Sequence, residues 1–298
     1  MSKIAVIGSG TMGNGIAHVF AQHDHQVSLI DKDEKALEKG LATIAKNLDR
    51  QIEKGIIQAE TKDSTLANIT PYSDMEKGVK NVAIVVEAAT ENTELKLEIF
   101  RQLDQFSPKE AILATNTSSI SITKIAAATS RPDKVIGMHF MNPVPVMQLV
   151  EVIKGYKTSE ETTHQVMSVA KALEKAPVAV NDYPGFVANR ILMPMINEAI
   201  YALYEGVSGV QEIDTVMKLG MAHPMGPLQL ADFIGLDVCH AILDVLYQGL
   251  GNPKYAPCPL LVNMVEAGNK GVKSGEGFYI YSQGSKELVV SERFQKQP

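Results

Sequence analysis

Short apolar runs alternate with longer amphipathic stretches over the first 180 residues of the chain. Continuous apolar runs are typical of strands buried on both faces of a parallel sheet, whereas apolar positions three and four residues apart predict helices. The runs predict strands at residues 4–7, 27–30, 82–86, 111–114, 135–138, 148–153 and 178–180, and the stretches between them predict helices at residues 11–23, 34–54, 94–106, 120–128 and 160–174. This alternation predicts an α/β fold built on a doubly wound, Rossmann-type, mostly parallel sheet.

The pattern becomes helical after this region. Helical spacing of apolar residues predicts helices at residues 186–204, 210–219, 228–247 and 260–267, and Pro184 suits the first turn of the first of these. A chain of 298 residues is also long enough for two domains. We therefore expect a Rossmann domain at residues 1–182 and a smaller all-α domain at residues 183–298. The polar tail after Tyr281 is expected to fray.

Composition excludes several classes of partner. The chain carries a net charge of −6, so it has no overall basic surface to attract nucleic acid or an anionic membrane. Its two cysteines, Cys239 and Cys258, are too few for a disulfide framework and do not have the spacing of a metal site. The chain enters its first strand without a charged and apolar leader. We expect a cytoplasmic protein that binds neither nucleic acid nor membrane.

A glycine-rich turn, Gly8–Gly13, joins the first predicted strand to the first predicted helix. In a dinucleotide-binding turn of this form, Gly8 allows the tight bend, Gly10 lets the backbone approach a pyrophosphate, and Gly13 lets the helix pack closely on the sheet. Asp31 ends the second predicted strand, where an acidic side chain accepts hydrogen bonds from the ribose hydroxyls. The sequence therefore predicts a dinucleotide site that also includes Thr11 and Met12 of the same turn.

The choice of dinucleotide depends on the charge at Asp31. A carboxylate repels the 2′-phosphate of NADP and so favours NAD, although Lys32 beside it weakens that discrimination. NADP therefore stays open. The alternative interpretation of the whole motif is an accidental glycine-rich turn in which Asp31 only caps the next helix.

A histidine follows another predicted strand, where parallel sheets gather their ligands. His139 comes after the apolar run at residues 135–138, and Glu151 lies at the end of the next run. An imidazole titrates near neutral pH, and a carboxylate beside it selects its tautomer and raises its basicity. The two residues suggest a proton-transfer pair. Taken singly, they are also consistent with a strand-end histidine and a solvated carboxylate.

Several motifs together resemble the 3-hydroxyacyl-CoA dehydrogenase family, and within it most of all the bacterial 3-hydroxybutyryl-CoA dehydrogenases. The motifs lie at residues 8–13, 114–119, 137–142 with Glu151, 184–190, 223–227 and 273–279, so the resemblance covers nearly the whole chain. It implies an NAD-dependent enzyme that interconverts (S)-3-hydroxybutyryl-CoA and acetoacetyl-CoA between its two domains. It also implies a homodimer formed through the helical domain.

The resemblance assigns roles to four residues. His139 is the general base in oxidation and the general acid in reduction, and Glu151 orients its ring. Ser118 bonds the substrate oxygen or places it beside the nicotinamide, and Asn189 orients the substrate. Ser118 and its neighbour Ser119 are equally consistent with caps of a helix that starts near residue 120, and Asn189 with a helix-surface amide.

The resemblance implies further contacts with less support from the residues themselves. Glu91 and Lys96 match family positions that contact the cofactor near its nicotinamide end, with an exposed charged helix start as the alternative explanation. Asn142 contributes to the cofactor site, pins its loop or supports the carboxylate that pairs with the histidine. Arg50 and Lys54 are candidates for the anionic end of CoA, with a solvated helix face as the alternative.

Hydride transfer to a nicotinamide needs no metal, and the histidines show no metal-ligand spacing, so we expect none. Two other functions stay open. The first is an NAD-dependent dehydrogenase of a free hydroxy acid or sugar acid on the same fold. The second is a nucleotide-binding protein without catalytic activity.

Overall fold

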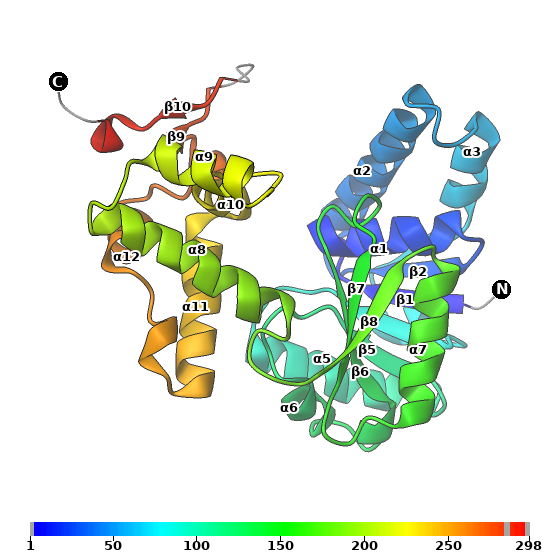
Figure 1. The fold of residues 1–298 in the computed structure, drawn as a ribbon. Coiled ribbons are helices and arrows are strands. Elements are labelled where there is room, and N and C mark those ends of the chain that lie inside the picture. The colour runs from blue at the N-terminus through cyan, green and yellow to red at the C-terminus, as the bar shows by residue number, and fades with distance from the viewer. Residues whose placement is uncertain (1–2, 283–286, 296–298) are drawn as a thin grey trace. The chain divides into compact units, whose positions relative to one another are not determined.

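The computed structural model describes residues 3–282 and 287–295. The chain divides into two compact units, Met1–Tyr183 and Pro184–Pro298 (Figure 1). The first unit contains the main sheet and the second is largely helical. The binding roles expected of the second unit stay predictions.

The first unit is built on an eight-stranded sheet with the order β3-β2-β1-β4-β5-β6-β7-β8. Its strands are β1 (Lys3–Ile7), β2 (Gln26–Ile30), β3 (Ile69–Tyr72), β4 (Ile84–Glu87), β5 (Ile112–Thr115), β6 (Val135–Phe140), β7 (Leu149–Lys154) and β8 (Ala176–Asn181). The six strands β1 to β6 run parallel, β7 runs antiparallel to β6, and β8 runs parallel to β7. The order of the first six is that of a dinucleotide-binding sheet, so the expected doubly wound, mostly parallel fold is confirmed.

Helices connect these strands and cover the sheet. They are α1 (Thr11–Gln22), α2 (Glu34–Glu53), α3 (Ala59–Ala67), α4 (Met75–Gly78), α5 (Thr93–Phe106), α6 (Ile122–Ala126) and α7 (Glu160–Ala172). Buried side chains of α1, α2 and α7 share one apolar core with β1, β2, β4, β6 and β7. Beyond that core, α2 and α3 form a helical hairpin that projects from the sheet (Figure 1).

The edge strand β3 and the helix α3 are absent from the sequence-based prediction. Pro71 lies inside β3 and argues against a strand, because proline donates no ladder hydrogen bond. The structure tolerates it because β3 is the edge of the sheet and pairs only with β2. In α3 the only buried side chain is Thr65, so the segment has no apolar stripe to reveal it.

The second unit packs its helices around a separate apolar core. They are α8 (Ala188–Tyr204), α9 (Val210–Gly220), α10 (Pro227–Ile234), α11 (Leu236–Leu250) and α12 (Pro259–Glu266). A short antiparallel pair, β9 (Tyr279–Ile280) and β10 (Val289–Val290), completes the unit. No helix in the described ranges has both the length and the apolar character needed to cross a membrane.

Three local expectations for this unit are wrong. The continuous helix predicted over residues 228–247 is broken at Gly235, whose φ of 102° no helix accommodates. Pro184 lies in a turn rather than in a helix, because Gly185 and Phe186 have φ values of 75° and 51° and delay the start of α8. The tail after Tyr281 does not simply fray, since β10 pairs with β9 and Ser291 N donates to Phe278 O at 3.0 Å. Residues 283–286 and 296–298 of that tail lie outside the described residues.

A histidine is buried completely within the first core. His18 lies on α1 with no exposed surface, and burial lowers its pKa to about 4. A histidine with a lowered folded pKa contributes stability that is fully present above the unfolded pKa of 6.5. That stability is lost as pH falls toward 4, because only the unfolded chain takes up the proton.

We expect the free energy of unfolding to fall between pH 7.5 and pH 4.5 by about 2–3 kcal/mol more in the wild-type protein than in His18→Gln. Glutamine has a similar volume and does not titrate in this range. Urea unfolding at the two pH values measures the difference, and other titrating groups cancel because both proteins carry them. Equal losses in the two proteins would contradict a neutral, buried His18.

Candidate active site

Most of the candidate site residues lie at the carboxyl ends of the parallel strands. Gly8 follows β1, Asp31 follows β2, and Glu87 is the last residue of β4. Ser118 lies in the loop after β5, and His139 lies near the end of β6. The switch point of the strand order falls between β1 and β4, and open parallel sheets bind ligands at that point.

The glycine turn has the close contacts that the sequence pattern requires. Gly8 has a φ of 94°, and a Cβ there would lie 2.8 Å from the carbonyl oxygen of Ala88. A Cβ on Gly13 would overlap the carbonyl oxygen of Gly8. At Gly10, by contrast, a Cβ would meet nothing within 4 Å, so the backbone faces open space at the start of α1. A pyrophosphate fits this arrangement, because the first amides of a helix attract anions.

Asp31 faces this turn and does not cap the following helix. Its Oδ2 accepts hydrogen bonds from Ser9 N and Ser9 Oγ, both at 2.9 Å. The N-cap of α2 is instead Asp33, whose side chain accepts from Lys35 N. A cavity of about 630 Å³ opens beside Asp31 and is bordered by Gly8, Ala89 and other residues of the β1, β2 and β4 ends. The cavity is large enough for part of a dinucleotide.

His139 and Glu151 form a buried pair across two strands. They are direct partners in the antiparallel register of β6 and β7, which places both side chains on one face of the sheet. His139 Nδ1 lies 2.9 Å from Glu151 Oε2, and the two residues are 8% and 2% exposed. Because an ionised carboxylate only accepts, Nδ1 carries the proton in the neutral imidazole and Nε2 is its basic nitrogen. No group of three or more His, Cys, Asp or Glu side chains in the described parts of the chain is arranged to hold a metal ion.

Glu91 organises the loop that carries Ser118. Its Oε1 accepts from Thr117 Oγ1 at 2.6 Å, from the backbone N and Oγ of Ser118 at 2.9 and 3.2 Å, and from the backbone N and Oγ of Ser119 at 3.1 and 2.9 Å. Burial raises the pKa of Glu91, but the Lys96 charge and these hydrogen bonds outweigh it, so the pKa lies below its ordinary value. Ser118 and Ser119 do not cap α6, because Ser121 is its N-cap.

A second carboxylate, Glu87, is fully buried. Its Oε1 accepts from Lys96 Nζ and from Ala89 N, each at 2.6 Å, and its Oε2 accepts from Thr115 Oγ1 at 2.7 Å. Lys96 is 1% exposed and also lies 3.5 Å from Glu91 Oε2. Lys96 therefore bridges the buried Glu87 and the partly exposed Glu91, and the alternative of an exposed charged helix start is wrong for Lys96.

The amide that holds the end of β6 is Asn116, not Asn142. Asn116 Oδ1 accepts from Phe140 N at 2.8 Å, one residue beyond the catalytic candidate His139. Asn142 instead stands before a cis bond to Pro143 and borders a cavity beside the glycine turn. The backbone after it is held by Lys175, whose Nζ donates to Val144 O at 2.7 Å and to Met147 O at 2.9 Å. Burial lowers the pKa of Lys175.

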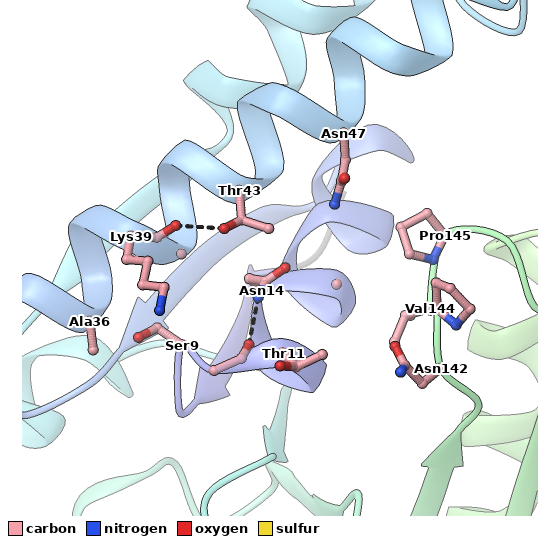
Figure 2. Close-up of a pocket in the computed structure, with 14 residues that line it drawn as sticks. Ser9, Thr11, Asn14, Ala36, Lys39, Thr43, Asn47, Asn142, Val144 and Pro145 are labelled. Carbon is pink, nitrogen blue, oxygen red and sulfur yellow. Dashed lines mark hydrogen bonds between the residues drawn. The ribbon is translucent and has the colours of Figure 1, made fainter. Parts of the chain in front are cut away.

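The cavity beside Asn142 has a volume of about 370 Å³ and a mostly polar wall on its α2 side. Figure 2 shows Lys39, Thr43 and Asn47 extending from α2 toward it, with Asn14 on α1 and Asn142 opposite. Helical spacing places the exposed Arg50 on the same face of α2, one turn beyond Asn47, and the exposed Lys54 is the C-cap residue one further turn along. Asn189 lies in the first turn of α8, in the second unit.

The sequence alone predicts no specific role for three of these residues, although Glu87 and Asn116 follow or end strands at the side of the sheet where ligands are expected. Glu87 was noticeable only as a charge at the end of an apolar strand, and nothing indicated that Lys96 would be buried against it. Asn116 lies inside the motif at residues 114–119, but its partner is a backbone amide that no pattern reveals. Lys175 acts through two carbonyl groups about 30 residues earlier in the chain, so local sequence carries no signal for it.

Comparisons with known proteins identify the family of the chain. The chain matches the NAD-binding domain of 3-hydroxyacyl-CoA dehydrogenase over residues 3–183 and the C-terminal domain of that enzyme over residues 185–281. It is 53% identical to a probable 3-hydroxybutyryl-CoA dehydrogenase of Bacillus subtilis over 283 residues, which cover 95% of this chain and 98% of the relative. It is 43% identical to the human mitochondrial hydroxyacyl-coenzyme A dehydrogenase, over 94% of this chain and 91% of that protein.

A solved structure gives the same result for the fold. The (S)-3-hydroxybutyryl-CoA dehydrogenase of Ralstonia eutropha superposes with a TM-score of 0.92 at 49% identity, and the match covers 95% of this chain and 100% of that one. The family models and this structure extend over both units, so the similarity is not confined to the nucleotide-binding sheet. The chain belongs to the 3-hydroxyacyl-CoA dehydrogenase family.

Proposed function

We propose that the protein interconverts (S)-3-hydroxybutyryl-CoA and acetoacetyl-CoA in an NAD-dependent reaction. When bound beside the glycine turn and Asp31, NAD would supply the acceptor for the hydride that leaves carbon 3 of the substrate in oxidation. Two lines of support converge on this conclusion. The family has the NAD-binding domain found here, and relatives about 50% identical carry the name 3-hydroxybutyryl-CoA dehydrogenase.

The observation that carries the proposal is the buried pair His139–Glu151. His139 lies near the carboxyl end of β6, and the glycine turn follows the carboxyl end of the parallel strand β1. In oxidation the 3-hydroxyl loses its proton to His139 Nε2 as the carbonyl forms, and in reduction the imidazolium returns a proton to the same oxygen. Glu151 stabilises the charge that the imidazole gains and keeps Nε2 as the basic nitrogen. Ser118 and Asn189 complete the proposed site as groups that bind and orient the substrate oxygen.

We assign the rest of the dinucleotide contacts to the residues around the turn. Residues Gly8, Gly10, Thr11, Met12 and Gly13 surround the pyrophosphate in this proposal, and Asp31 accepts from the ribose. Glu91, Lys96 and Asn142 are assigned to the half of the site near the nicotinamide. Support for Glu91 comes from its five hydrogen bonds to the loop that carries Ser118.

The CoA part of the substrate is assigned to the exposed face of α2. Lys39, Asn47, Arg50 and Lys54 lie on or close to one stripe of this helix, and the stripe begins at the cavity shown in Figure 2. Three of these four side chains are cations, which suits the phosphate groups of CoA. A free hydroxy acid has no group that would reach along this stripe.

We also propose that the protein is a homodimer that associates through its second unit. Large apolar side chains on and around α9 are exposed, with Val207, Val216 and Leu219 at 72%, 60% and 83%. A cavity of about 400 Å³, lined mainly by apolar residues of α8 and α9, opens on the same region. Several large exposed apolar side chains in one region are typical of a surface covered by another subunit.

The first test is turnover. We expect the wild-type protein to consume NADH with acetoacetyl-CoA, and His139→Gln to reduce kcat by roughly two to four orders of magnitude because it removes the proton donor. Binding of NADH, followed by its fluorescence, is expected to be unchanged in this variant. His164→Gln, which changes an exposed histidine on α7, is the matched control.

The same assay separates CoA esters from free acids. Acetoacetate at equal concentration is expected to react far more slowly than acetoacetyl-CoA. The double variant Arg50→Gln/Lys54→Gln is expected to raise KM for acetoacetyl-CoA roughly five- to thirtyfold with kcat unchanged, because two cations near the phosphates are lost. A faster reaction with the free acid than with acetoacetyl-CoA would favour the alternative hydroxy-acid dehydrogenase. In the turnover test, a near-normal kcat in His139→Gln would reject His139 as the general acid.

A second prediction concerns the choice of dinucleotide. We expect kcat/KM for NADH to exceed that for NADPH by roughly tenfold or more, because Asp31 repels the 2′-phosphate. Asp31→Asn keeps an acceptor for Ser9 and removes the charge, so it is expected to narrow this ratio. Glu38→Gln, at an exposed position of α2, serves as the control for a general change of charge. A wild-type preference for NADPH would reject the role of Asp31.

A third prediction concerns assembly. Light scattering after gel filtration is expected to give a mass near twice the 32.3 kDa of the chain at micromolar concentration. Val216→Glu places a charge among the exposed apolar side chains on and around α9 and is expected to shift the protein toward monomer. Tyr156→Lys, at an 88% exposed position in the first unit, is the control. A wild-type monomer would contradict the proposal.

A further inference from the structure

A single buried carboxylate connects the three parts of the chain that surround the proposed nicotinamide site. Glu87 ends β4 with no exposed surface, and both of its oxygens accept hydrogen bonds from inside the protein. The bonds come from the β4–α5 turn through Ala89 N, from α5 through Lys96 Nζ, and from the end of β5 through Thr115 Oγ1. In the β4–β5 register Glu87 and Thr115 are direct partners.

The first connection reaches the wall of the dinucleotide cavity. Ala89 N donates to Glu87 Oε1 at 2.6 Å, which fixes the turn that begins with Ala88. This turn lies against the glycine motif so closely that Gly8 has no room for a side chain beside Ala88. Ala88 and Ala89 also line the cavity next to Asp31.

The other two connections reach the loop that carries Ser118. Thr115 Oγ1 donates to Glu87 and accepts from Thr117 N at 3.2 Å. Lys96, held by Glu87 at 2.6 Å, lies 3.5 Å from Glu91, which accepts the hydrogen bonds of residues 117–119. The loop is therefore connected to Glu87 in two ways, through the Thr115 hydroxyl and through the Lys96–Glu91 pair.

The charges make this arrangement sensitive to its central member. Lys96 is 1% exposed, and a buried ammonium charge destabilises the fold unless it is paired and hydrogen-bonded. Glu87 provides the carboxylate nearest to Lys96. Without that carboxylate, Lys96 retains Ala89 O at 3.1 Å and the more distant Glu91. The Lys96 ammonium is then drawn toward Glu91. There it competes with the serine and threonine donors for the Glu91 carboxylate.

We propose that Glu87 is a positioning residue for hydride transfer, which through Lys96 and Thr115 holds Glu91 and the Thr117–Ser119 loop in their working geometry. This inference rests on the proposed function. Glu87 has no exposed surface, so it acts through the residues that it binds. A displacement of about 1 Å at a reacting group costs roughly a hundredfold in rate, so a buried hydrogen-bond centre of this kind affects turnover more than ground-state binding.

The test uses a matched pair at Thr115 together with Glu87→Gln. Thr115→Val removes the hydroxyl with little change of volume, whereas Thr115→Ser retains it. We expect Thr115→Val and Glu87→Gln to lower kcat for acetoacetyl-CoA reduction roughly ten- to a hundredfold, with KM for acetoacetyl-CoA within about threefold of wild type. Thr115→Ser is expected to stay within about threefold of wild type in kcat. The dissociation constant of NADH is expected to rise severalfold in the two impaired variants.

The outcomes separate positioning from a structural role. A lower melting temperature in Thr115→Val and Glu87→Gln with kcat and NADH affinity unchanged would overturn the inference. If Glu87→Gln does not fold, the comparison of valine with serine at position 115 decides. If the wild-type protein itself fails to reduce acetoacetyl-CoA, the proposed function fails. The NADH dissociation constants then test the positioning role, because equal values in valine and serine variants would reject it.

Discussion

The proposed dinucleotide site depends on the contact between the glycine turn and the end of β4. Gly8 and Gly13 have no space for a side chain, because the backbone at Ala88 and the carbonyl of Gly8 occupy it. This contact joins β1, α1 and β4 at the switch point of the sheet. The cavity beside Asp31, the exposed amides at the start of α1 and the segment that Glu87 holds are all defined by the same few atoms.

The antiparallel strand β7 explains why His139 and Glu151 face each other. A purely parallel sheet would return each strand through a helix, and two facing residues would then come from distant parts of the chain. Here β7 returns directly beside β6, so His139 and Glu151 become opposite neighbours after a short loop. Burial of both groups strengthens their interaction, since less water screens it.

Sequence patterns predicted most of the parallel sheet and the glycine turn, because apolar runs and backbone geometry are local properties. They missed β3, where a proline is tolerated only because the strand is an edge, and they missed the break at Gly235. In the site, the motif residues around Gly8, Ser118 and His139 were accessible from sequence. The contacts of the supporting groups were not, because Glu87, Asn116 and Lys175 act on backbone or buried partners that only the fold brings together.

The pairing of His139 with Glu151 limits which insertions and deletions the sequence between β6 and β7 tolerates. Side chains alternate between the two faces of a strand, so a shift of β7 by one residue against β6 would place Val150 or Val152 opposite the imidazole. The carboxylate would then point into the other face of the sheet. Insertions and deletions are consequently tolerated in the loop between the two strands only if they leave the strand register intact, whatever the new loop contains.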